Sequence, residues 1–111
     1  MGESAKYISD LFNYSRRRTI AVKVGNIEIG GDNPIRIQSM ANTDTNDTKA
    51  SVEQALKIEQ AGGELVRFTA QGVKEATNLE AIRSELRKKG AKAPLVADIH
   101  FNPKAAEVAA L

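Results

Sequence analysis

The 111-residue sequence contains no cysteine and no tryptophan, and its one histidine is His100. Without thiols the chain forms no disulfide, no thiolate metal site and no iron–sulfur cluster on its own cysteines. His100 and its near neighbour Asp98 supply only two of the three or four ligands that a metal site needs. The sequence therefore predicts no metal and no cofactor bound by this chain.

Long apolar runs are also missing, and none approaches the roughly 18 residues that span a bilayer. The first residues, which lead up to the basic run Arg16–Arg18, lack the apolar region of a secretory signal. Sixteen Lys and Arg against fourteen Asp and Glu give a formal net charge of only +2. We therefore expect a cytoplasmic protein that binds neither nucleic acid nor a membrane.

The residues that are present fit one small domain, because 41% of them are hydrophobic. Residues 1–18 show no clear period, and we expect a lead-in that is poorly ordered or locally helical. Residues 19–31 alternate between apolar and polar on both sides of Gly25-Asn26. This alternation predicts a two-stranded β-hairpin with a tight turn.

A strand followed by a helix then recurs about every 30 residues, the length of a βα unit in a parallel sheet. The first helix is expected to begin at Asp47 or Thr48, and the third at Asn102-Pro103. The sequence thus predicts an α/β protein. Its three units cover 35–62, 64–90 and 94–111.

Spacings of three and four residues predict which helix side is buried. The expected stripes are Val52, Ala55 and Leu56 in the first helix, and Val73, Ala76, Leu79, Ile82 and Leu86 in the second.

Alternation also sorts each strand into two faces. One face is apolar and should lie under the helices: Ile35, Ile37, Val66, Phe68, Leu95, Ala97 and Ile99. The opposite face, which includes Arg36, becomes polar toward the strand ends, with Gln38, Arg67, Thr69, Asp98 and His100. A doubly wound sheet of the flavodoxin type favours apolar residues on both faces, whereas a barrel carries polar site residues at the C-terminal ends of its strands. We therefore predict the first three βα units of a (β/α)8 TIM barrel, which is an incomplete barrel.

Arg67 lies in mid-strand between apolar neighbours, where a guanidinium requires an anionic partner. It would form either an internal ion pair with Asp98 or a fork for a phosphate or carboxylate, and the two roles are compatible. Asp98 and His100 are candidates for metal ligands, for an acid–base couple or for a hydrogen-bonded pair. The loop "SMANTDTNDT" is typical of turns and helix caps, although Ser39, Asn42 and Thr43 would reach a barrel mouth.

Three stretches carry a resemblance to a known family: "IRIQSMANTDTNDT", "GGELVRFTAQGVKEA" and "PLVADIHF". Together they resemble the N-terminal part of the 4-hydroxy-3-methylbut-2-enyl diphosphate synthase family, in its longer three-domain form. The resemblance implies a (β/α)8 barrel and a separate C-terminal domain that holds a [4Fe-4S] cluster. That domain is absent from this chain.

The same resemblance implies an oxidoreductase of non-mevalonate isoprenoid synthesis. Family members reductively open 2-C-methyl-D-erythritol 2,4-cyclodiphosphate with electrons from flavodoxin or ferredoxin. Carried over by position, Arg67 and His100 contact the substrate, Asp98 is their polar neighbour, and Gln38 and Asn42 form part of the mouth. The chain departs from the family at Ala41, where a hydroxyl residue is usual.

Because the cluster ligands are missing, we expect this chain to be an inactive fragment of the enzyme. An open sheet edge predicts self-association, and hence a homo-oligomer. Two alternative functions remain open at this point. One is a fragment of a phosphate-binding barrel of the dihydropteroate synthase kind, and the other is a non-enzymatic binding or assembly module.

Overall fold

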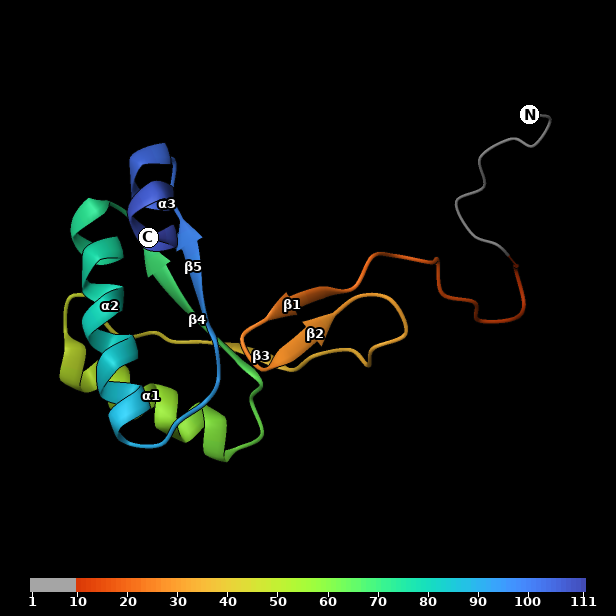
Figure 1. Ribbon diagram of the computed structural model, residues 1–111, viewed down its shortest axis with the longest axis horizontal. Helices are drawn as coiled ribbons and strands as arrows, with labels where there is room; N and C mark the ends of the chain where they lie inside the picture. Colours follow the sequence, from red (N-terminus) through yellow and green to blue (C-terminus); the bar gives the residue numbers. More distant parts are fainter. Residues whose placement is uncertain (1–9) are drawn as a thin grey trace.

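A computed structural model describes residues 10–111 and divides them between a hairpin and an α/β unit (Figure 1). In chain order the elements are β1 (Val22–Val24), β2 (Ile27–Ile29), β3 (Gln38–Met40), α1 (Thr48–Gln60), β4 (Leu65–Ala70), α2 (Val73–Lys88), β5 (Leu95–Ile99) and α3 (Pro103–Ala110). Residues 10–18 contain no helix or strand. The rest of the expected lead-in, residues 1–9, lies outside the described residues.

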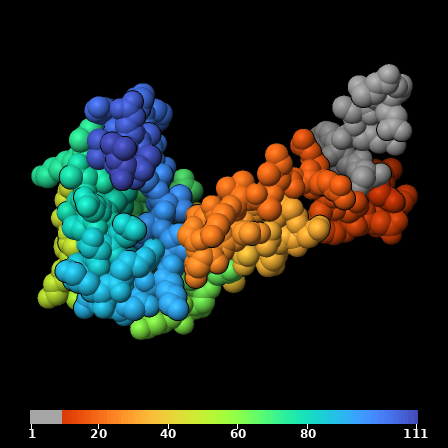
Figure 2. Space-filling model, viewed as in Figure 1, coloured from red at the N-terminus to blue at the C-terminus, as the bar shows by residue number. Residues whose placement is uncertain are grey.

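Strands β1 and β2 pair antiparallel, with Val24 opposite Ile27. Gly25 in the connecting turn has a φ of +58°, a conformation that glycine adopts without strain. A Cβ at Gly25 would lie 3.1 Å from Cβ of Pro94, so the tip of the hairpin touches the chain just before β5. The rest of the hairpin extends away from the α/β unit as an arm (Figure 2).

The second sheet is parallel, in the order β3-β4-β5, which confirms the predicted α/β class. In its register Met40 lies opposite Arg67, and Thr69 lies opposite Asp98. Because partners in a parallel ladder share a face, the polar ends of β4 and β5 lie side by side.

The helix ends follow the local signals. The Asp47 side chain accepts a hydrogen bond from the backbone N–H of Ala50 at the start of α1, and the Asn102 side chain caps α3 in the same way. Gly62 ends α1 with a φ of +105°. The predicted caps are therefore confirmed.

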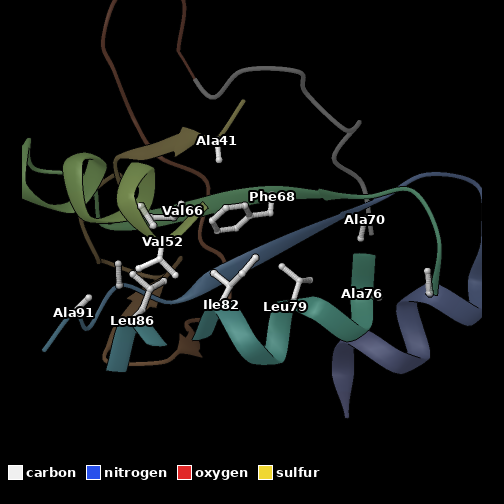
Figure 3. Close-up of a cluster of buried hydrophobic side chains, with 13 residues drawn as sticks. Ala41, Val52, Val66, Phe68, Ala70, Ala76, Leu79, Ile82, Leu86 and Ala91 are labelled. Atoms are coloured by element: carbon white, nitrogen blue, oxygen red, sulfur yellow. The ribbon is translucent and has the colours of Figure 1, made fainter. Parts of the chain in front are cut away.

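The core lies between the sheet and the helices (Figure 3). Val66 and Phe68 of β4 face Ile82 of α2, and all three side chains are essentially fully buried. The predicted stripe of α2 is confirmed except at Val73, its first residue, which is 39% exposed. The apolar faces predicted for β4 and β5 are also confirmed, since both face this core.

A strand is present in the first βα unit, but its predicted start at Ile35 and its predicted apolar face were wrong. The strand begins at Gln38, and Ile35 and Ile37 are 82% and 58% exposed. The helices pack on β4 and β5 and do not cover the segment before β3. Glu64 holds that segment, because its Oε1 accepts a hydrogen bond from the Ile37 N–H. Ala41, just after the strand, supplies the buried apolar position on this side of the core.

Within the described residues, no helix is long and apolar enough to cross a membrane.

Candidate functional site

Three polar side chains meet on the face of the sheet opposite the core. Arg67 comes from the middle of β4, Asp98 from β5, and His100 directly follows β5. Arg67 Nη2 lies 3.2 Å from Asp98 Oδ2, and His100 Nε2 lies 3.4 Å from the same oxygen. The carboxylate therefore joins the two nitrogen side chains, and the predicted ion pair of Arg67 with Asp98 is present.

The cluster is partly buried and retains an unused donor. The side chains of Arg67, Asp98 and His100 are 39%, 22% and 36% exposed. Arg67 Nε is buried and has no hydrogen-bond partner in the described part of the chain. Buried donors are nearly always paired, so this N–H is an exception among the described residues.

Asp98 is the anionic centre of the cluster. Burial raises the pKa of Asp98, but the hydrogen bonds and charges of Arg67 and His100 outweigh burial and hold that pKa below its usual range. Asp98 is consequently ionised at neutral pH and is unsuited to be a proton donor. The ionised carboxylate forms an ion pair with the guanidinium of Arg67.

Gln38 and Asn42 lie apart from this cluster. Gln38 is opposite Leu65 in the register, so it shares the face of Arg67 but lies nearer the start of the strands. Asn42 Oδ1 accepts from Gln54 Nε2 at 2.7 Å, and the Asn42 backbone N–H donates to Gln54 Oε1 at 2.8 Å. In this structure Asn42 therefore ties its loop to α1, with no described contact to Arg67.

The remaining polar residues of the loop have mostly structural partners, as turn and capping chemistry predicts. The Thr43 hydroxyl lies 2.9 Å from that of Ser51 in α1. Thr45 is buried and donates to the Thr69 carbonyl. The sequence did not predict the burial of Thr45, because its partner lies 24 positions away and no local pattern indicates such a pairing.

Arg36 is another residue that the sequence misplaced. It was expected on the polar face with Gln38, but it lies before the strand and joins separate segments. Its Nε donates to the Glu28 carbonyl of the hairpin, and its Nη1 is 2.9 Å from Glu64 Oε2. Arg36 is thus a clamp between the hairpin and the sheet.

The residues present do not fit an iron–sulfur cluster. The sequence has no cysteine, and the described residues contain no group of three His, Asp or Glu that could hold a metal ion. The cluster implied by the family resemblance would need ligands from outside this chain.

A groove of about 990 Å³ lies on the other side of the sheet from the polar cluster. It is lined by the hairpin tip, α2, the start of β5 and the end of α3. Leu95 and Ala97 in its lining belong to the face of β5 that packs on the core. The groove is therefore separate from the site of Arg67.

Comparison with known proteins agrees with the parallel α/β fold. Residues 19–111 match the family model of the GcpE TIM-barrel domain. A protein of Bacteroides thetaiotaomicron called 4-hydroxy-3-methylbut-2-en-1-yl diphosphate synthase (flavodoxin) is 63% identical over 101 residues, which cover 91% of this chain and 16% of that protein.

Proteins with the same name from two other organisms are similar to this chain to a comparable degree. The one from Porphyromonas gingivalis is 60% identical over 92% of this chain and 18% of its own length. The one from Akkermansia muciniphila is 53% identical over 96% of this chain and 18% of its own length. The chain thus spans less than a fifth of these relatives.

Proposed function

From the premise that the chain belongs to the GcpE TIM-barrel domain family, we propose that its three βα units are the first three of a (β/α)8 barrel. The parallel order β3-β4-β5 supports this arrangement, since successive strands of a barrel are neighbours. The polar ends of β4 and β5 then face the barrel mouth.

We further propose that the longer protein containing this chain is a 4-hydroxy-3-methylbut-2-en-1-yl diphosphate synthase. The names of the relatives support an oxidoreductase that uses flavodoxin as electron donor. Its substrate would be 2-C-methyl-D-erythritol 2,4-cyclodiphosphate, and this chain would supply part of the pocket for the diphosphate. The same names disfavour the dihydropteroate synthase alternative and the non-enzymatic module.

The observation that carries the proposal is the cluster of Arg67, Asp98 and His100. The guanidinium of Arg67, whose side chain is 39% exposed, offers charge-assisted hydrogen bonds to a phosphate oxygen. His100 offers a second nitrogen, and Asp98 fixes the guanidinium before the substrate arrives. Gln38 and Asn42 would border the same mouth.

The chain alone would bind and orient substrate without completing the reaction. In such an enzyme an iron–sulfur cluster would pass the electrons from flavodoxin to the substrate, and the sequence has no cysteine to hold one. We therefore propose that the 111-residue chain is inactive by itself, cytoplasmic, and assembled with further copies of itself through its open sheet edges.

The test is substrate binding by the full-length protein with Arg67→Gln or His100→Ala. Either change should weaken binding of the cyclodiphosphate roughly tenfold or more, because each removes a donor to the diphosphate. The matched control is Arg83→Gln on the exposed side of α2, which should leave the affinity unchanged.

The iron–sulfur cluster content of the full-length protein, read from its visible absorption, should be the same in all three variants. Unchanged affinity in the Arg67 and His100 variants would contradict the proposed pocket. Loss of the iron–sulfur absorption instead would assign these residues to cofactor assembly.

A further inference from the structure

The loop of residues 41–47, between β3 and α1, is anchored by hydrogen bonds to the sheet and to a helix. Thr45 in this loop is 2% exposed, and together with Ser51 it makes up the buried polar residues of the described chain. A buried hydroxyl requires a partner, so the contacts of Thr45 indicate what holds the loop.

The partner of Thr45 is the end of β4. Thr45 Oγ1 donates to the Thr69 carbonyl at 2.7 Å and lies 3.3 Å from Thr69 Oγ1. On the other side of the loop, Asn78 Nδ2 from α2 donates to the Thr45 carbonyl at 2.8 Å. One residue is therefore tied both to the sheet and to a helix.

Thr69 places this anchor beside the polar cluster. It lies two residues after Arg67 on the same strand face, and it is opposite Asp98 in the register of β4 and β5. Any shift of Thr45 relative to Thr69 moves the loop across the strand ends where Arg67 and His100 would hold a ligand.

The loop also carries a donor suited to an anion. The Asn42 side chain accepts from Gln54 through Oδ1, Asn42 is exposed, and its Nδ2 group has no partner among the described residues. An amide group of this kind donates to phosphate or hydroxyl oxygens, provided that the loop holds it in place.

We propose that Thr45 is a positioning residue for substrate binding: its hydroxyl fixes loop 41–47 against the end of β4, beside the strand ends where Arg67 and His100 would hold a ligand. This inference rests on the proposed function, and it adds a residue that touches no ligand. Removing the hydroxyl leaves every charge of the cluster unchanged and alters only the placement of the loop.

The experiment compares Thr45→Val with Thr45→Ser in the full-length protein. Valine keeps the shape of threonine and loses the hydroxyl, whereas serine keeps the hydroxyl and loses a buried methyl group. The dissociation constant for 2-C-methyl-D-erythritol 2,4-cyclodiphosphate should rise roughly tenfold in the valine variant and stay near the wild-type value in the serine variant. The affinity should be lost only in the variant without the hydroxyl, even if both variants lower Tm. If Thr45 merely stabilised the fold, the affinity would fall together with Tm in both variants.

Two further variants complete the design. Thr77→Val removes a hydroxyl that donates to the Val73 carbonyl on the exposed side of α2, and it should not change the affinity. Asn78→Ala loosens the same loop from its other side, and it should weaken binding in the same direction as Thr45→Val. If the Thr45→Val variant does not fold, the affinity of the Asn78→Ala variant tests whether the placement of the loop matters for binding.

Equal affinity in wild type and Thr45→Val, or equal loss in the valine and serine variants, would overturn the role of Thr45. Neither result would affect the proposed function, because wild-type binding would still be observed. Failure of the wild-type protein to bind the cyclodiphosphate would instead overturn the proposed function, and this inference with it.

Discussion

At the scale of single residues, Phe101, which follows the end of β5, has a strained backbone conformation. Its φ is +57°, the left-handed region that residues with a Cβ rarely adopt, and its side chain is fully exposed. Among residues 10–111 the ring therefore has no packing that would offset the strain. Strained residues of this kind gather at functional sites, and Phe101 directly follows His100.

The strain gives a test on the chain itself. Phe101→Gly should raise the free energy of unfolding by about 1 kcal/mol, because relief of the left-handed conformation exceeds the entropy that glycine adds to the unfolded chain. Phe101→Ala is the control, since alanine retains the Cβ and should change stability little. Chemical denaturation measures both, and equal stability of the two variants would show that Phe101 carries no strain.

At the scale of elements, the hairpin and the sheet are joined by a few polar contacts. The Arg36 side chain connects the Glu28 carbonyl of β2 with the Glu64 carboxylate, which precedes β4. Glu64 also accepts from the Ile37 N–H and so holds the segment before β3. These contacts replace the regular strand that the sequence predicted there.

The Glu64 contacts make stability depend on pH. The backbone hydrogen bond from Ile37, together with Arg36, holds the pKa of Glu64 below its usual range. Because the pKa is lower in the folded than in the unfolded chain, the carboxylate stabilises the fold above its ordinary pKa, and this contribution is lost as the pH falls through the folded value.

Wild type should therefore be more stable than Glu64→Gln at about pH 7, and the difference should shrink toward about pH 3. Urea unfolding at both pH values measures the difference. Glu80→Gln is a control, because Glu80 lies on the exposed side of α2. A difference that grows on acidification would show that the sign is wrong.

The start of α1 offers a second test at this scale. Asp47→Ala removes the oxygen that accepts from the Ala50 N–H, and it should lower the free energy of unfolding by about 1 kcal/mol. Asp47→Ser keeps an acceptor and should recover most of the loss. Thermal unfolding of the two variants provides the comparison, and an unchanged Tm in the alanine variant would mean that α1 does not need its cap.

The whole molecule is extended for its length. Its radius of gyration is 17.3 Å, whereas a compact domain of this size has about 13 Å. The hairpin arm leaves Ile20 and Val22 exposed, and Ile35 and Ile37 are exposed before β3. Apolar side chains beside open sheet edges favour association with further copies of the chain.

Self-association can be measured directly on the 111-residue chain. Sedimentation velocity should show species larger than the monomer, and the double change Ile35→Ser with Ile37→Ser should shift the distribution toward the monomer. Val73→Ser, which alters a partly exposed valine on α2, is the control and should leave the distribution unchanged. A wild-type chain that is folded and strictly monomeric would contradict the prediction.

Much of the fold was predictable because its signals are local. Alternation around Gly25 indicated the hairpin, and the apolar stripe through Leu79 and Ile82 indicated the buried side of α2. Alternation in β5 also placed Asp98 and His100 on one face. Such periods depend only on backbone geometry, so they can be read without knowing the neighbours.

The sequence by itself determined the parallel α/β class, the helix caps and the shared face of Arg67, Asp98 and His100. Only the tertiary structure decided that Ile35 and Ile37 stay exposed, that Arg36 is a clamp and that Thr45 is buried against Thr69. The physical reason is that burial and long-range hydrogen bonds depend on which segments the folded chain brings together. A residue's own type and period leave that choice open.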